Sequence, residues 1–125
     1  MAVEFSAWDE QVDDTTHVVA VRGEIDIFTA PEFKERITKA IDAGRSLVVV
    51  DLGGTSFIDS SSLGVLISAH RRLSGRGGRL VIACDVPAVR NTFRITGLDS
   101  VLSIVESREA ALAPAPDDGP AERAA

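Results

Sequence analysis

One stretch, residues 48–67, constrains the fold more than any other part of the chain. It begins with the β-branched run Val48-Val49-Val50, which is typical of a buried strand, and continues through Gly53-Gly54. The triplet Ser60-Ser61-Ser62 follows Asp59, and apolar residues then recur at 63, 66, 67 and 73, which is helical spacing. The stretch therefore predicts a strand, a break at the glycine pair, a loop, and a helix whose first turn carries three hydroxyl groups.

The flanking segments predict an alternation of strands and helices. Residues 3–8 alternate apolar and polar side chains, and a short polar connection leads to a second strand at 17–22, so this pair is expected to be antiparallel. Thr29, Pro31 and Glu32 predict a helix start with a capping box. The other expected elements are strands at 46–51, 79–84 and 101–105, and helices at 60–74, after a capping Asp85, and at 106–112. This order predicts an α/β sandwich with a mixed sheet of four to five strands and about four helices.

The size and charge of the chain exclude several classes of function. The 125 residues suit one domain, and a net charge of −6 argues against general binding to nucleic acid or to anionic membranes. The single cysteine, Cys84, excludes an intramolecular disulfide. We see no signal peptide and no apolar run of membrane-spanning length, so we expect a cytoplasmic protein that binds neither DNA nor membranes directly.

The end of the chain differs in composition from the rest. From residue 113 onward it consists of alanine, proline, glycine and charged residues, which are too poor in large apolar side chains to pack. We therefore expect a folded domain at residues 1–112 and a disordered tail at residues 113–125.

Ser60, at the predicted helix start, has two possible roles. In the structural interpretation, Ser60 or the preceding Asp59 simply caps the helix. In the functional interpretation, a kinase adds a phosphate with a charge of roughly −1.5 to −2, which a partner surface that docks the free hydroxyl cannot accommodate. Free N–H groups and the helix dipole would favour this anion, so the phosphate is expected to act on the partner rather than on the fold.

A catalytic role for Ser60 is disfavoured, and we expect no enzymatic activity. A hydrolytic serine needs a base within reach and an oxyanion hole. The chain has two histidines: His17 opens a strand, and His70 is interpreted as a packing residue on the helix. The residues around Ser60 also lack the Gly-x-Ser-x-Gly pattern of a nucleophile elbow.

Metal and redox chemistry are also disfavoured. Asp26, Asp51 and Asp59 lie near predicted strand ends, but they are interpreted as loop carboxylates and helix caps rather than metal ligands. Cys84 is interpreted as a small buried apolar side chain, with redox sensing as the less favoured alternative. We therefore expect no metal and no cofactor.

Three motifs, in order and spacing, resemble the bacterial anti-sigma factor antagonists, which are stand-alone STAS domains. The resemblance extends from about residue 3 to residue 112, and its middle motif is the most specific. The motifs are Gly23-Glu24-Ile25-Asp26 followed by Thr29-Ala30-Pro31, then Phe57-Ile58-Asp59-Ser60-Ser61-Ser62-Leu63-Gly64-Val65-Leu66, and finally Ile95-Thr96-Gly97-Leu98.

The resemblance implies a STAS-like fold and a partner-switching function. The unphosphorylated protein would bind an anti-sigma factor that is also a serine kinase, and binding would free a sigma factor for transcription. The kinase would phosphorylate the first serine after the aspartate, Ser60, and a PP2C-type phosphatase would reverse this step. The expected partner-binding residues are Asp26, Asp59, Ser61, Ser62 and Gly64.

Ser62 departs from the family pattern, which usually has glycine at this position. Its β-carbon and hydroxyl could crowd a kinase that approaches the backbone closely. The departure also leaves Ser61 and Ser62 as alternative phosphorylation sites. An alternative function that the resemblance leaves open is that of a STAS subunit in a stressosome or in a transport complex.

Overall fold

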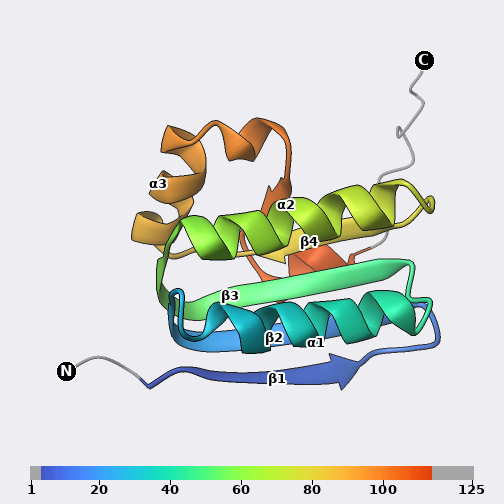
Figure 1. The fold of residues 1–125 in the computed structure, drawn as a ribbon. Coiled ribbons are helices and arrows are strands. Elements are labelled where there is room, and N and C mark those ends of the chain that lie inside the picture. The colour runs from blue at the N-terminus through green and yellow to red at the C-terminus, as the bar shows by residue number, and fades with distance from the viewer. Residues whose placement is uncertain (1–3, 114–125) are drawn as a thin grey trace, which may run out of the picture.

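The computed structural model describes residues 4–113, which form a five-stranded sheet with helices on both faces (Figure 1). The strands lie in chain order; β1 is antiparallel to β2, and β2 to β5 are parallel. The strands are β1 (Ser6–Gln11), β2 (Thr16–Ile25), β3 (Leu47–Ile58), β4 (Arg79–Ala83) and β5 (Ser103–Val105). The helices are α1 (Ala30–Asp42), α2 (Ser60–Ser74), α3 (Pro87–Ile95), the 3₁₀ helix η1 (Leu98–Ser100) and α4 (Arg108–Leu112). The predicted α/β class and mixed sheet are confirmed.

The two faces of the sheet are covered unequally. On one face, α1 and α2 lie side by side and form the main core with β2, β3 and α3 (Figure 1). Phe33 and Phe93, from α1 and α3, are fully buried there. On the other face, the short α4 covers a small cluster around Val18, Val49 and Ala111. No helix within residues 4–113 is long and apolar enough to cross a membrane.

The prediction for the central strand is wrong at its end, because β3 continues through Gly53-Gly54 as far as Ile58. The parallel pairing with β2 continues past the glycines, and Thr55 donates a side-chain hydrogen bond to the Val21 carbonyl at 3.2 Å. A β-carbon at Gly54 would lie 2.9 Å from the Arg22 side chain, so glycine here permits a close approach of two strands rather than a break.

Three local predictions are also wrong. Thr29 precedes α1 but makes no capping bond to it, so the predicted capping box with Glu32 does not form. Val86, not Asp85, is the residue before α3. The first strand lies at residues 6–11 rather than 3–8. By contrast, the predicted bounds of the helix at 60–74 are confirmed. Most of the predicted tail, residues 114–125, lies outside the described residues, and the domain boundary at 112 stays a prediction.

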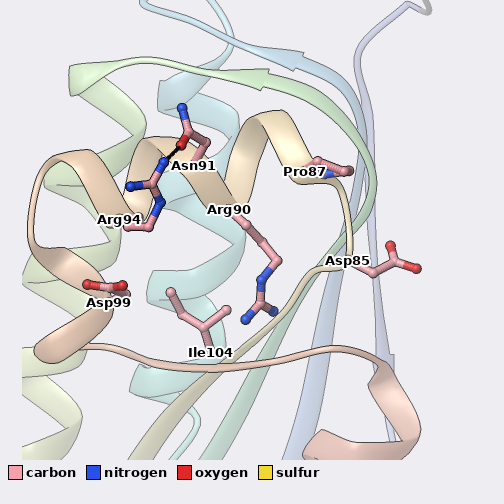
Figure 2. Close-up of a pocket in the computed structure, with 7 residues that line it drawn as sticks. All are labelled: Asp85, Pro87, Arg90, Asn91, Arg94, Asp99 and Ile104. Atoms are coloured by element: carbon pink, nitrogen blue, oxygen red, sulfur yellow. Dashed lines mark hydrogen bonds between the residues drawn. The ribbon is translucent and has the colours of Figure 1, made fainter.

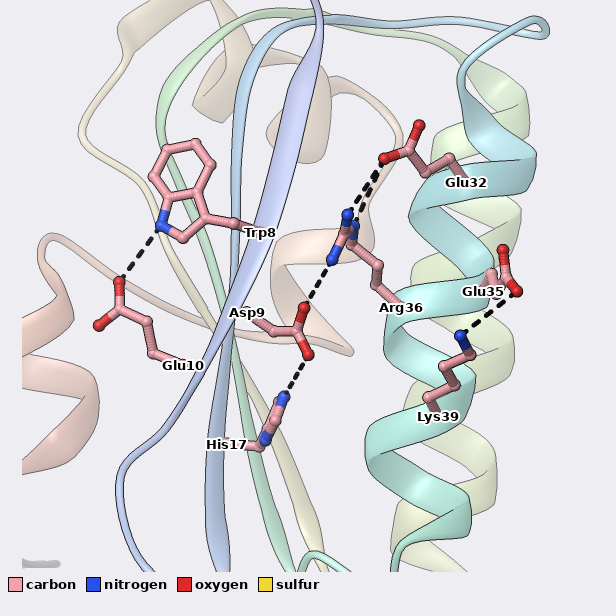
Figure 3. A network of polar contacts seen from close by, with 8 residues as sticks. All are labelled: Trp8, Asp9, Glu10, His17, Glu32, Glu35, Arg36 and Lys39. Atoms are coloured by element: carbon pink, nitrogen blue, oxygen red, sulfur yellow. Dashed lines mark hydrogen bonds and ion pairs between the residues drawn. The ribbon is translucent and has the colours of Figure 1, made fainter.

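A polar network connects the charged end of β1 to β2 and α1 (Figure 3). Asp9 Oδ1 accepts a hydrogen bond from Arg36 Nη1 of α1 at 2.6 Å, and its Oδ2 lies 2.9 Å from Nε2 of His17 on β2. Arg36 is also paired with Glu32 at 3.4 Å. The contact with His17, followed by that with Arg36, holds the pKa of Asp9 below its ordinary value. Asp9 therefore joins the edge strand both to the sheet and to α1.

We expect Asp9→Asn to lower the free energy of unfolding at pH 7 by up to about 1 kcal/mol, because its partners are only partly shielded from water. Since the folded-state pKa of Asp9 lies below that of the unfolded chain, about 3.9, the carboxylate stabilises the fold above that pH. This contribution is lost as the pH falls through the folded-state pKa. Urea unfolding of both proteins between pH 7 and pH 2.5 measures the difference, which should shrink toward acid pH.

Glu35→Gln is the matched control, because Glu35 is paired with Lys39 at 3.6 Å and both side chains are largely exposed. We expect almost no change in this variant at any pH. An Asp9→Asn difference that stays constant down to pH 2.5 would contradict the assigned role of the ionised carboxylate.

Candidate functional site

The parallel strands β2 and β3 end at the same edge of the sheet, and the predicted site residues lie at this edge. Ile25 pairs with Ile58 at the last position of the two strands. The loop of residues 26–29 follows Ile25, and Asp59 and the start of α2 follow Ile58. Two segments that are far apart in the sequence, one with Asp26 and one with Asp59 and Ser60, therefore lie at the same end of the molecule (Figure 1).

Asp59 caps α2 through its side chain. Its Oδ1 atom accepts hydrogen bonds from the Ser61 and Ser62 backbone N–H groups, at 3.0 and 3.2 Å, and from the Ser61 hydroxyl at 2.5 Å. The Ser61 hydroxyl, with the Ser62 groups, holds the pKa of Asp59 below its ordinary value. The expectation of free N–H groups at this helix start is therefore wrong for two of them, because the ionised Asp59 already occupies those donors.

The three serines of the first turn have different environments. Ser60 is exposed, and its hydroxyl makes no hydrogen bond with any of the described residues. Ser61 is half-buried and donates to Asp59. Ser62 is fully buried; its hydroxyl accepts from the Asp59 backbone N–H at 3.1 Å and donates to the Ile25 carbonyl at 3.0 Å. The structural interpretation of a cap thus applies to Asp59 and not to Ser60, and Ser62 completes the capping box. Of the three serines, Ser60 is the exposed one.

Asp26 shapes the loop of residues 26–29. Its Oδ1 atom accepts hydrogen bonds from the Phe28 and Thr29 backbone N–H groups, at 2.9 and 3.1 Å, and lies 3.2 Å from the Thr29 hydroxyl. The turn exposes 68% of Ile27 and 87% of Phe28. Phe57, near the end of β3, is exposed by 49%. Sequence reasoning missed these three apolar residues, although two adjacent large apolar side chains in a loop were a usable signal.

Gly64 lies one helical turn after Ser60 on the same face of α2. It is exposed, and a β-carbon added there would meet no atom within 4 Å. The fold therefore does not require glycine at this position, and Gly64 presents no side chain beside Ser60.

Neither histidine, nor Asp51, is brought close to Ser60. His17 lies at the opposite end of β2, and His70 lies ten residues along α2, roughly 15 Å away at the rise of a helix. Asp51 lies within β3 and is bound by Arg108 at 3.1 Å, away from Asp26 and Asp59. Within residues 4–113, no group of three or more histidine, cysteine, aspartate or glutamate side chains is arranged to hold a metal ion.

Cys84 is buried, as predicted, and packs in the main core. Burial raises the pKa of its thiol, which keeps the sulfur protonated and unreactive at neutral pH. The less favoured alternative, redox sensing, gains no support from this position.

A hollow with a volume of about 390 Å³ lies between α3, η1 and β5, away from the candidate site (Figure 2). Arg90 donates to the Cys84 carbonyl at 2.8 Å, and carboxylates balance the arginines of the lining. No residue of the 26–29 loop or of the first turn of α2 lines this hollow. Its lining residues are Asp85, Pro87, Arg90, Asn91, Arg94, Asp99 and Ile104.

Comparison with known proteins identifies the family to which this chain is similar. Residues 7–111 match the STAS domain. The anti-sigma-B factor antagonist of Listeria monocytogenes is 36% identical over 93 residues, which cover 73% of this chain and 81% of that protein. The crystal structure of an anti-sigma factor antagonist from Mycobacterium paratuberculosis is similar, with a TM-score of 0.79 and 28% identity over 87% of this chain and 92% of the other.

The fold is also similar to SpoIIAA, an anti-sigma factor antagonist of known structure in two states. The unphosphorylated form gives a TM-score of 0.71, with 27% identity over 86% of this chain and 92% of SpoIIAA. The phosphorylated form of the Bacillus protein gives 0.65, with 27% identity over 86% of this chain and 96% of the other. These relatives are named as regulators rather than enzymes. The chain belongs to the STAS domain family and, within it, to the anti-sigma factor antagonists, which are non-enzymatic regulators.

Proposed function

We propose that this protein binds an anti-sigma factor that is also a serine kinase, and that phosphorylation of Ser60 ends the complex. Binding in the unphosphorylated state withdraws the anti-sigma factor from its sigma factor, and a PP2C-type phosphatase restores the binding form. The observation that carries the proposal is the exposed Ser60 hydroxyl, without a hydrogen bond among the described residues, at the start of a capped helix.

The surroundings of the serines favour Ser60 over the two alternative phosphorylation sites. Ser62 is 0% exposed, so a kinase would have to unfold the first turn of α2 to reach it. The Ser61 hydroxyl donates to Asp59 and is partly covered. Transfer of a phosphoryl group to Ser60 breaks no hydrogen bond within residues 4–113.

The exposed apolar side chains supply the contact area that a protein partner requires. Ile27, Phe28 and Phe57 lie at the same end of the sheet as Ser60. Aromatic and aliphatic side chains that stand out from a soluble domain commonly act as anchors in protein interfaces. We therefore include these three residues in the proposed partner-binding surface, with Asp26, Asp59, Ser61 and Gly64. Ser62, which the sequence also predicted as a partner-binding residue, is 0% exposed and cannot touch a partner directly.

Charge explains how one phosphate would end the complex. Asp59 next to Ser60 is held ionised, and Asp26 lies at the same end of the sheet. A phosphate would add roughly −1.5 to −2 charges to these carboxylates, in a contact that would then have to be desolvated. Structures of the similar SpoIIAA in both phosphorylation states support a stable fold in each state.

We expect Ser60→Ala to bind the anti-sigma factor but to resist release by ATP, because the acceptor hydroxyl is absent. Ser60→Asp should weaken binding by about tenfold or more, because an added charge opposes desolvation of the interface. Both variants should unfold within about 0.5 kcal/mol of wild type, since Ser60 is exposed. Calorimetric titration with the anti-sigma factor, with and without ATP, measures these effects.

Peptide mass spectrometry of the protein from its native host identifies the modified serine. We expect a phosphate on Ser60 whose occupancy changes with growth conditions. A phosphate on Ser61 or Ser62 instead would contradict the assignment. If the protein binds its partner but carries no phosphate under any growth condition, the alternative function would be favoured, in which it is a permanent subunit of a larger STAS assembly.

We expect Gly64→Ala to change stability and binding in opposite directions. Alanine should raise the free energy of unfolding by roughly 0.5–1 kcal/mol, because it favours the helix and its β-carbon meets no atom within 4 Å. The same β-carbon stands on the face that carries Ser60 and should weaken partner binding. Urea unfolding and calorimetric titration of one preparation test both effects, and an unchanged affinity would remove Gly64 from the proposed surface.

A further inference from the structure

The Ser62 hydroxyl joins the two segments that make up the candidate site. It is 0% exposed and lies within hydrogen-bond distance of the Asp59 backbone N–H, the Asp59 carboxylate and the Ile25 carbonyl. Apart from the pairing of β2 with β3, no other hydrogen bond among the described residues connects residues 24–29 with residues 59–64.

The direction of the Ser62 proton follows from its neighbours. The hydroxyl has one proton and two acceptors in range, Ile25 O at 3.0 Å and Asp59 Oδ1 at 3.1 Å. Asp59 Oδ1 already accepts from three donors, the Ser61 and Ser62 backbone N–H groups and the Ser61 hydroxyl. An oxygen with filled lone-pair directions is the poorer acceptor, so the proton lies toward the Ile25 carbonyl. This bond joins α2 to the end of β2.

The loop that follows Ile25 has few other constraints. Most of its hydrogen bonds join atoms within residues 24–29. Two more join it to α1, from the Ala30 and Phe33 backbone N–H groups to the Asp26 and Thr29 carbonyls at 2.8 and 3.2 Å. Ile27 and Phe28 are exposed. These bonds fix the shape of the loop and join it to α1, and the Ile25–Ser62 bond is the hydrogen bond that joins the start of the loop to the first turn of α2.

We propose that Ser62 is a positioning residue that couples the Ile27–Phe28 loop to the helix start carrying Ser60, so that the partner meets both as one rigid surface. The proposal rests on the proposed function for the identity of that partner. Ser62 does not touch the transferred phosphate; it acts through Ile25 and Asp59. Where the family usually has glycine, this bond has no equivalent, so the residue makes the recognition surface of this chain more rigid.

The first test uses the free protein. Amide hydrogen exchange is compared in Ser62→Ala and in Ser61→Ala, the matched control, which loses a hydroxyl bonded to Asp59 but not to Ile25. We expect exchange at Phe28 and Thr29 to become about fivefold faster in Ser62→Ala and to stay unchanged in Ser61→Ala. Central β3 amides should be unaffected in both. Equal exchange at the loop in the two variants would overturn the proposal.

The second test uses the anti-sigma kinase of the native host. For phosphorylation of Ser60, Ser62→Ala should raise KM about fivefold and leave kcat within about twofold, because the acceptor hydroxyl itself is intact. Ser62→Gly, with the residue usual in the family, should behave in the same way. A loss confined to kcat would overturn the positioning role. If the loop amides respond as expected but the kinase never modifies wild-type Ser60, the proposed function fails while the coupling stands.

Discussion

The geometry of the candidate site depends on the Asp59 carboxylate. By accepting three hydrogen bonds on one oxygen, it begins α2 immediately after β3 and determines where each of the next three side chains points. Ser60 is left in solvent, Ser61 is held against the cap, and Ser62 is turned into the core. Since these hydrogen bonds favour the ionised form of the carboxylate, its lowered pKa and the shape of the site have the same cause.

The parallel pairing of β2 and β3 gives this cap its functional context. Because both strands end at the same edge, the Asp26 loop and the start of α2 become neighbours. The two aspartates serve similar structural purposes there, each accepting backbone N–H groups of its own turn. The carboxylates of Asp26 and Asp59, whose charges are proposed to repel a phosphate, are therefore held in place by the hydrogen bonds that shape the two turns. The proposed repulsion needs no further charged residues.

Much of the fold could be predicted because its signals are local. The bounds of α2 were predicted from apolar spacing and the Asp59 cap, and the α/β class followed from alternating periods. The failures were positions where distant contacts override local preference. Gly53-Gly54 indicated a break, but pairing with β2 continues the strand to Ile58. Thr29 suited a capping box, but its hydroxyl lies near Asp26 and the Glu24 carbonyl instead.

The sequence by itself determined that a strand leads through Asp59 into a helix that begins with serines, since helical periodicity and capping depend on residues a few positions apart. It also carried the motifs that mark the family. Only the tertiary structure decided which serine is exposed and which is buried. The partner of Ser62 is a carbonyl 37 residues earlier in the chain, and the packing of the sheet brings the two together. Local patterns carry no record of such a contact, so three adjacent serines that look equivalent in sequence acquire different roles.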